Sequence, residues 1–261
     1  MAVNRVFDPV AEATSAFQLV IKNWMLAVPQ LIVGCVVVAL ALVLGLGSIM
    51  AAGGIAALMN SSNSGSGLAA LSGLFGTIWI IALVGCILGL IAYAATVAAA
   101  DDAWSGRPVN IGAAIGKGIA CLFQLIIFGL IVAIPSVLLG ITVIVPLAIA
   151  VLMMYGLPAI VISGQSGIGA ITESYNLVTK NFGPSLIAIL AVIVAYIAGF
   201  VINMVLGIIP IVGQIIGLVV GALIFAYACA VIVRFYSLLR SGAIVAAAPA
   251  SPVPPAPPTA S

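Results

Sequence analysis

The stretch Ile168-Gly-Ala-Ile-Thr-Glu-Ser-Tyr-Asn-Leu-Val-Thr-Lys-Asn-Phe182 occurs a second time, in altered form, near the start of the chain. When it is displaced by 158 positions, its closing Lys180-Asn181-Phe182 falls on Lys22-Asn23-Trp24. Apolar residues recur every three or four positions in both copies, which predicts a helix with one apolar face. Each copy continues directly into a long apolar segment. We interpret the repeated unit as an amphipathic helix at the membrane surface followed by a membrane span.

The composition independently indicates a membrane protein. Hydrophobic residues make up 65% of the 261 residues, and charged residues make up 5%. The mean hydropathy is +1.45. So few polar side chains cannot cover the surface of a water-soluble globule of this length. The net charge of +2 is too small to favour nucleic acid, which attracts clustered basic residues.

The long apolar runs predict an all-α integral membrane fold with six transmembrane helices and two or three interfacial amphipathic helices, built from internal repeats of one interfacial helix and one hairpin. The expected spans cover residues 25–47, 71–98, 122–139, 143–162, 185–206 and 214–235. A third surface helix is expected over Ile111 to Cys121, where the repeat keeps Lys117 but loses the Asn-aromatic ending. The expected domains are an N-terminal segment with its interfacial helix (1–24), the six-span domain (25–240) and a disordered Ala/Pro-rich tail (241–261).

Two features of the spans predict local departures from a straight helix. Pro135 and Pro158 each remove a backbone N–H within an apolar run, so we expect bends there. The second span exceeds the roughly 20 residues that cross the hydrocarbon, and we expect it to tilt, or to bend at Gly85-x-x-x-Gly89.

The charges predict the orientation of these spans. With six crossings, all seven basic and all five acidic residues lie on one side, together with both termini. Because Lys and Arg accumulate in cytoplasmic loops, that side is predicted to be the cytoplasm, and the location a bacterial inner membrane. In the tail, Pro252-x-x-Pro255 matches a PxxP docking pattern, although composition alone also produces such spacing.

The chain has little of what catalysis needs. Histidine is absent, no charged residue falls inside a span, and the cysteines Cys35, Cys86, Cys121 and Cys229 stand singly, as apolar packing residues do. The Asp101-Asp102 pair could hold a divalent ion or act as acid and base, but a single acidic pair at a helix end is more often a solvated boundary. We therefore expect no enzyme activity, cofactor or metal.

Four basic residues are candidate contacts to lipid headgroups or to a partner: Lys22, Arg107, Lys117 and Lys180. Each is expected on or beside a cytoplasmic surface helix, where a cation can reach a lipid phosphate. The alternative is that they only anchor and orient the helices. On the helix expected over Ile168 to Phe182, Glu173, Asn176 and Lys180 are expected to be the more exposed side chains.

Small residues indicate close packing of helices, within the bundle or between copies of the chain. The candidate packing positions are Gly85, Gly89, Gly199, Gly213, Gly217 and Gly221. A homo-oligomer or a larger membrane complex is therefore among the expected partners, besides membrane lipids.

The unit of a surface helix followed by a span resembles the membrane domain attached to some bacterial glycerophosphoryl diester phosphodiesterases and found in related six-span proteins. The residues that carry the resemblance are Gly106-Arg107-Pro108-Val109-Asn110 before the second surface helix and Glu173 to Phe182 in the third. The resemblance covers most of residues 8–240. In the fused relatives a separate soluble domain with histidine and acidic residues performs the hydrolysis; it is absent here, so the resemblance does not imply that activity.

Three functions remain open from the sequence. The first is a non-enzymatic module that binds or organises lipids or partner proteins. The second is a transporter or lipid-translocating protein for an apolar or zwitterionic solute, which the repeats and proline-containing spans would suit. The third is a structural subunit of a membrane complex.

Overall fold

The computed structural model describes residues 8–51, 64–138, 144–209 and 212–242, and all regular elements in these ranges are helices. In chain order they are α1 (Pro9–Lys22), the 3-10 helix η1 (Trp24–Ala27), α2 (Val28–Ala51), α4 (Ser64–Trp104), α5 (Ile111–Ala120), α6 (Leu122–Leu138), α7 (Ile144–Leu152), α8 (Gly156–Val161), α9 (Gly167–Lys180), α10 (Phe182–Leu206) and α11 (Val212–Arg240). Arg5, the expected turn at residues 139–143 and the Pro-rich part of the tail lie outside the described residues.

Four helical segments are long and apolar enough to cross a membrane: Trp24–Gly47, Phe75–Trp104, Phe182–Leu206 and Val212–Arg240. A fifth is reached if α5 and α6, which meet at an angle of 60°, count as one bent span. At about 1.5 Å per residue, the 25 residues of α10 exceed the roughly 30 Å of hydrocarbon. The structure is therefore that of a helical membrane protein, and its described residues contain four or five apolar helices that can span, where the sequence predicts six.

When the bent α5–α6 pair is counted as the third span, the remaining difference arises at the expected fourth span, residues 143–162, which is divided into α7 and α8 by the turn Met153–Tyr155. Pro158 lacks the N–H that would continue the helical ladder, so a break shortly before it is expected. The backbone N–H of Tyr155 instead donates to Ser174 Oγ at 3.1 Å. The Ser174 hydroxyl in turn donates to the carbonyl of Leu152 at 2.7 Å. Two polar groups freed by the break are thereby satisfied.

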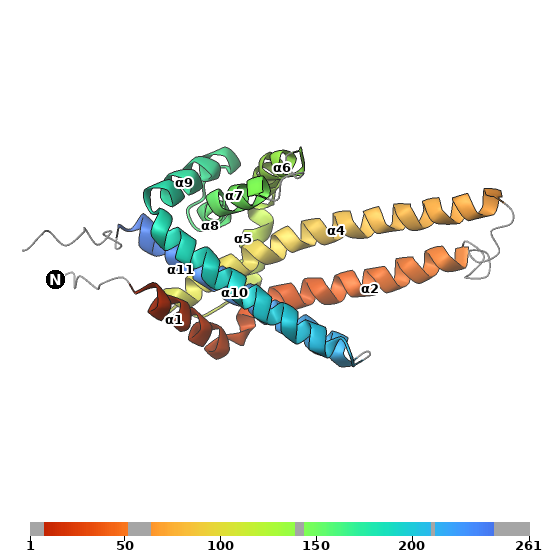
Figure 1. The fold of residues 1–261 in the computed structure, drawn as a ribbon, viewed down its shortest axis with the longest axis horizontal. Coiled ribbons are helices and arrows are strands. Elements are labelled where there is room, and N and C mark those ends of the chain that lie inside the picture. Colours follow the sequence, from red (N-terminus) through yellow and green to blue (C-terminus); the bar gives the residue numbers. More distant parts are fainter. Residues whose placement is uncertain (1–7, 52–63, 139–143, 210–211, 243–261) are drawn as a thin grey trace, which may run out of the picture.

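The other two expected irregularities leave the helices uninterrupted. α6 continues through Pro135 to Leu138. α4 continues through Gly85 and Gly89 and is a single helix of 41 residues that extends beyond both ends of the expected second span. Among the described side chains of α4, only those of its C-terminal part enter the protein core, and the rest of the helix extends away from it (Figure 1).

We call the compact end of the molecule the hub. It consists of the surface helices α1, α5 and α9 together with α8 and the C-terminal parts of α4 and α11. Its core is rich in small residues: Ala94, Ala95, Ala98, Ala99 and Ala100 of α4 and Ala226, Ala228 and Ala230 of α11 are buried. Small side chains let helix backbones approach closely, as is common between membrane helices.

The hairpins extend from the hub in different directions. Figure 1 shows α2 and α4 leaving it side by side, while α10 and α11 leave at another angle and α6 and α7 lie on the side of the hub opposite α1. Outside the hub the helices are exposed around most of their circumference. In the most apolar stretch of α10, for example, 17% of the residues are buried. Such apolar surfaces require lipid around them.

The second and third surface helices each pack on the hairpin that comes before them in the chain. The first surface helix packs on the last hairpin, so the packing forms a closed cycle. α5 packs mainly on α4, and α9 packs on α6, α7 and α8. α1, which no described hairpin precedes, packs instead on α11 and α10, the last hairpin of the chain. We call the helix that ends each hairpin its second arm. The three second arms are α4, α8 and α11, and they contact one another in the centre of the hub.

All three second arms end in the same way. Just after each helix comes a Ser-Gly pair, Ser105-Gly106, Ser163-Gly164 or Ser241-Gly242, whose glycine has a positive φ of 69°, 65° or 65° respectively. These are the three glycines of positive φ among the described residues. Glycine adopts this left-handed conformation without the steric cost that a Cβ imposes, which is why it commonly ends helices.

Candidate functional site

The surface helices α1 and α9 have matching ends. Each has 14 residues, and each is capped by the asparagine that follows its last lysine. The side-chain amide of Asn23 donates to the carbonyl of Leu19 at 3.1 Å, and that of Asn181 donates to the carbonyl of Leu177 at 3.1 Å. The two asparagines share the same unusual backbone conformation, with φ near −122° and −130°. These caps satisfy carbonyls that helix ends leave without partners.

The N-terminal caps stand at the corresponding positions. The carboxylate of Asp8 accepts hydrogen bonds from the backbone N–H groups of Val10 and Ala11, and the hydroxyl of Ser166 accepts one from Gly169. In α9 the side-chain oxygen of Gln124 also accepts from the N–H of Gly167 at 2.8 Å. Polar side chains at this position typically stabilise a helix by about 1 kcal/mol.

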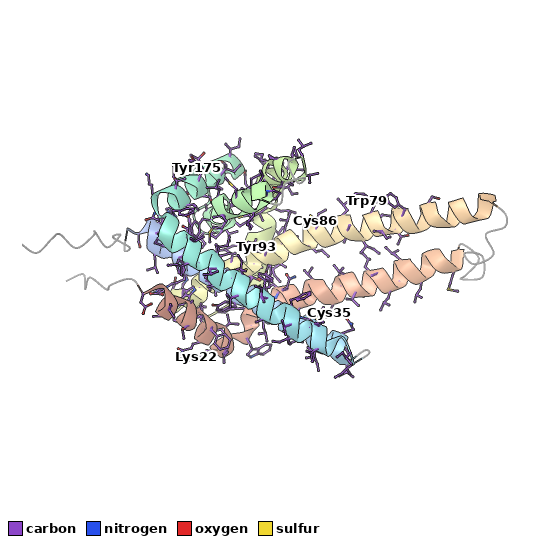
Figure 2. All side chains as sticks on the ribbon, in the orientation of Figure 1. Lys22, Cys35, Trp79, Cys86, Tyr93 and Tyr175 are labelled. Atoms are coloured by element: carbon purple, nitrogen blue, oxygen red, sulfur yellow. The ribbon has the colours of Figure 1, made fainter. Side chains whose placement is uncertain are left out.

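Matched positions of α1 and α9 also agree in burial. Val20 and Val178 are 4% and 0% exposed, and Phe17 and Tyr175 are 56% and 51% exposed. Each helix thus presents one apolar side to the hub and an aromatic side chain to its surroundings. Figure 2 shows Tyr175 and Lys22 on the outer surface of the hub.

The arginines of the hub are held by carboxylates. Arg107 contacts Asp101 and Asp102, both at 2.8 Å. Hydrogen bonding to Asp102 and the charges of both carboxylates raise the pKa of Arg107. Arg107 therefore compensates one of the two negative charges of the Asp101-Asp102 pair and ties both carboxylates to the end of α4, as a structural helix end would.

The other two arginines tie surface helices to α11. Arg234 pairs with Glu12 of α1 at 2.6 Å and stacks on Trp104, with its guanidinium carbon 4.7 Å from the ring centre. Arg240 pairs with Glu173 of α9 at 3.5 Å. The side chains of Glu12 and Glu173 are only 22% and 19% exposed. Glu173 is thus turned toward the hub, contrary to the expectation from the sequence, because α11 supplies it with partners.

A polar cluster surrounds the Glu173–Arg240 pair. The hydroxyl of Tyr236 donates to Glu173 at 2.6 Å and shares a hydrogen bond with Ser163 Oγ, which also contacts Arg240. Nearby, the hydroxyl of the fully buried Tyr155 donates to Ser185 at 3.3 Å. These contacts join the residues on either side of α8 to α9, α10 and α11. The sequence offered no local signal for them, since the partners are 30 to 77 residues apart.

The lysines differ from the arginines. Lys22, Lys117 and Lys180 each lie in the last turn of one surface helix, and all three are exposed. Among the described residues the salt bridges involve arginine alone, and none of these lysines takes part in one. The four candidate contacts from the sequence therefore divide into one neutralised arginine and three lysines whose ammonium groups face outward. Apolar side chains flank each lysine, for example Trp24 at 60% exposed and Ile119 at 57% exposed.

The candidate packing glycines fall into two groups. A Cβ at Gly199, Gly213 or Gly217 would collide with Ile224, with the Leu206 carbonyl or with Asn203, so these positions lie where α10 and α11 touch. Gly85 faces Val37 of α2, at ordinary contact distance. Gly89 and Gly221 have open space beside them.

No group of three or more potential metal ligands lies together in the described part of the chain, and the four cysteines are separate, with Cys229 buried. No family model, curated protein or solved structure matches this chain. The resemblance to the phosphodiesterase-linked membrane domain stays a prediction. The features left for a binding role are therefore the three exposed lysines, one at the end of each surface helix, and the exposed apolar side chains near them in the chain.

Proposed function

We propose that this chain is a non-enzymatic membrane module that binds and organises anionic phospholipids on the cytoplasmic side of a bacterial inner membrane. The observation that carries the proposal is the set of three exposed lysines, one at the end of each surface helix, with no carboxylate partner among the described residues. The carboxylates of four acidic residues are bound to arginines, and that of Asp8 caps α1.

Attraction to an anionic lipid surface is larger than the effect that these lysines have on their own helices. A basic residue near an anionic membrane surface contributes about 1 kcal/mol of attraction, so three contribute about 3 kcal/mol. That corresponds to roughly a hundredfold preference, because each 1.4 kcal/mol is about tenfold. A lysine at a helix C-terminus also stabilises its own helix by about 0.3–1 kcal/mol, and this smaller effect operates without lipid recognition.

A three-unit architecture accounts for the placement of the lysines. In this proposal each unit consists of a surface helix and a hairpin: α1 with α2 and α4, α5 with α6 and α7–α8, and α9 with α10 and α11. The cyclic packing of the surface helices and the Ser-Gly end of every second arm support it. The middle hairpin then supplies the third and fourth crossings of a six-span protein, with the α5–α6 bend and the α7–α8 break as its departures from straight spans.

Orientation follows from the same arrangement. The described arginines and lysines all belong to the hub or its margins, and the tips of the hairpins α2–α4 and α10–α11 lie at the far end from it (Figure 1). By the preference of Lys and Arg for the cytoplasm, the hub and both termini face that compartment.

The proposal is tested by replacing Lys22, Lys117 and Lys180 together with glutamine. The protein is extracted in native lipid discs and its co-purifying lipids are quantified by mass spectrometry. The matched control replaces the same lysines with arginine, which keeps the three charges. We expect the glutamine variant to lose the enrichment of anionic lipid and the arginine variant to keep it. Equal enrichment in both variants would rule the proposal out.

A further inference from the structure

A continuous apolar groove runs between α1 and the α10–α11 hairpin. Its hub-side part encloses about 440 Å³ and its outer part about 640 Å³. The two parts share Phe17, Ala191, Val194 and Tyr227, so they form one groove. Each part has the size of a small-molecule site, for which about 300–1,000 Å³ is usual.

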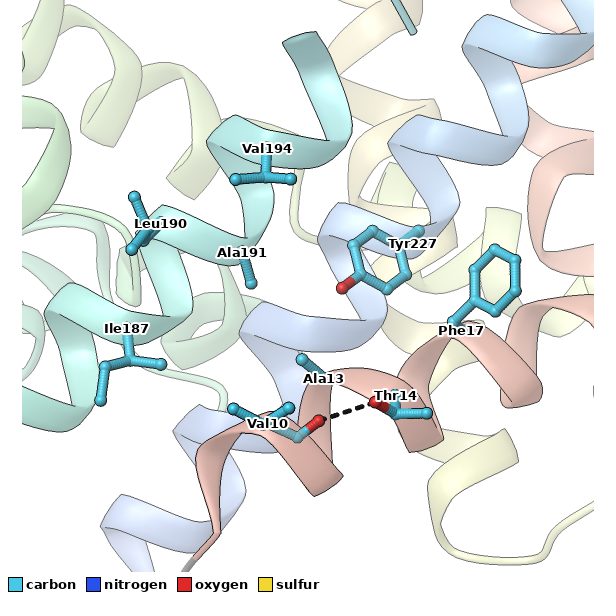
Figure 3. A pocket seen from close by; sticks show the side chains of 9 residues that line it. All are labelled: Val10, Ala13, Thr14, Phe17, Ile187, Leu190, Ala191, Val194 and Tyr227. Carbon is cyan, nitrogen blue, oxygen red and sulfur yellow. Dashed lines mark hydrogen bonds between the residues drawn. The ribbon is translucent and has the colours of Figure 1, made fainter. Parts of the chain in front are cut away.

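The groove exists because α10 turns small side chains toward α1. Ala191, Ala195, Ala198 and Gly199 recur at helical spacing and line it on one side, while Phe17, Ile21 and Trp24 line it from α1 and the start of η1. α1 rests mainly on α11 and touches α10 less, which leaves the space between α1 and α10 open. Figure 3 shows the hub-side part between the two helices.

Two polar side chains line the groove, and only one of them has a hydrogen-bond partner in the described part of the chain. The Thr14 hydroxyl donates to the carbonyl of Val10 at 2.9 Å and is therefore satisfied. The Tyr227 ring is held edge-on by Phe17, with ring centres 6.3 Å apart. Its hydroxyl has no hydrogen-bond partner among the described residues and points into the space between α1 and α10 in Figure 3. A phenol usually finds an acceptor when it is withdrawn from water.

We infer that this groove holds one acyl chain of an anionic glycerophospholipid, with the Tyr227 hydroxyl donating to an ester oxygen and Lys22 reaching the phosphate. The groove opens beside α10 and α11, helices long and apolar enough to span, so the medium that reaches it is hydrocarbon. Lys22 follows Ile21 directly and stands two residues before Trp24, both of which line the groove. Its long side chain carries the charge that complements a phosphate at the level of the headgroups. The inference rests on the proposed function and assigns one specific lipid position within it.

The experiment uses the full chain in discs of phosphatidylcholine containing phosphatidylglycerol whose acyl chain carries a photoactivatable group. After illumination, the cross-linked peptides are mapped by mass spectrometry. Ala198→Trp fills the groove from an exposed position that lines it. Val201→Trp is the matched control, because Val201 lies on the same helix, is 54% exposed and does not line the groove. Tyr227→Phe removes only the hydroxyl.

In the unchanged protein, cross-links are expected on the segments Phe17–Trp24 and Ala191–Ile202. We expect Ala198→Trp to lose them and Val201→Trp to keep them, while Tyr227→Phe retains them with fewer lipids held per protein. Cross-links spread evenly over all hairpins, or unchanged by Ala198→Trp, would overturn the inference. The proposed function would still stand in that case if the triple lysine variant loses anionic lipid, so the two failures are distinguishable.

Discussion

At the scale of single residues, arginine and lysine play different parts on the hub. The planar guanidinium makes several fixed hydrogen bonds at once, which suits Arg234 between Glu12 and the face of Trp104. The lysine ammonium is a compact charge on a flexible stem, and Lys22, Lys117 and Lys180 remain exposed at helix ends. The arginines stabilise the arrangement of helices, and the lysines carry the charge that we propose binds lipid.

This division predicts the effect of removing single charges. Glu12→Gln leaves Arg234, whose side chain is 27% exposed, without its carboxylate. The unfolding free energy should fall by about 1.5–3 kcal/mol, the usual contribution of a hydrogen bond to a charged group. Lys180→Gln removes a charge from a surface helix without breaking an ion pair and should lower stability by no more than about 0.3–1 kcal/mol, the amount that a cation contributes at a helix C-terminus. Thermal unfolding in the same detergent measures both, and equal effects of the two substitutions would contradict this assignment.

At the scale of elements, helix ends define the architecture. Two surface helices close on an asparagine that bonds its own last turn, and three second arms close on a glycine of positive φ. Between these ends the chain reverses direction within a few residues. The glycine ends of α4 and α8 therefore lie where the chain leaves a hairpin and begins the surface helix that packs on it.

Replacing a glycine by alanine should have opposite effects on stability at a helix end and inside a helix. Gly164→Ala places a Cβ at φ 65°, which costs about 1–2 kcal/mol, so the protein should become less stable. Gly129 lies inside α6 with open space beside it, and Gly129→Ala should stabilise the protein by about 0.5–1 kcal/mol. The two variants are compared by thermal unfolding. Stabilisation by Gly164→Ala would show that the left-handed conformation is not required there.

How far the sequence could predict these elements depends on the range of the interactions. Periodicity and capping residues are local, so the surface helices at Lys22 and Lys180 were predicted to within a residue or two of their ends. The break at Met153–Tyr155 depends on Ser174 and Ser185, which a reading of one segment does not bring near it. The inward turn of Glu173 likewise depends on Tyr236 and Arg240. The Ser-Gly dipeptide does not by itself specify a glycine of positive φ, so these helix ends are defined only by the fold.

At the scale of the whole molecule, the described charged residues lie in or beside the hub, and the apolar hairpins diverge from it (Figure 1). The last hairpin receives the first surface helix, so the cycle of packing closes. A closed cycle lets three short amphipathic helices share one small core rich in alanine. The three lysines all lie on the surface helices of the hub, and the even number of crossings that we propose between them puts them on one side of the membrane.

The side of the membrane reached by each lysine position is therefore the most direct test of the account. Single cysteines replace Lys22, Lys117 and Lys180 in a background where the four native cysteines are alanine, and intact and inverted membrane vesicles are treated with a membrane-impermeant maleimide. The three-unit account predicts that all three positions react only in inverted vesicles, where the cytoplasmic face is outside. Reaction of any one of them from the opposite side would contradict it.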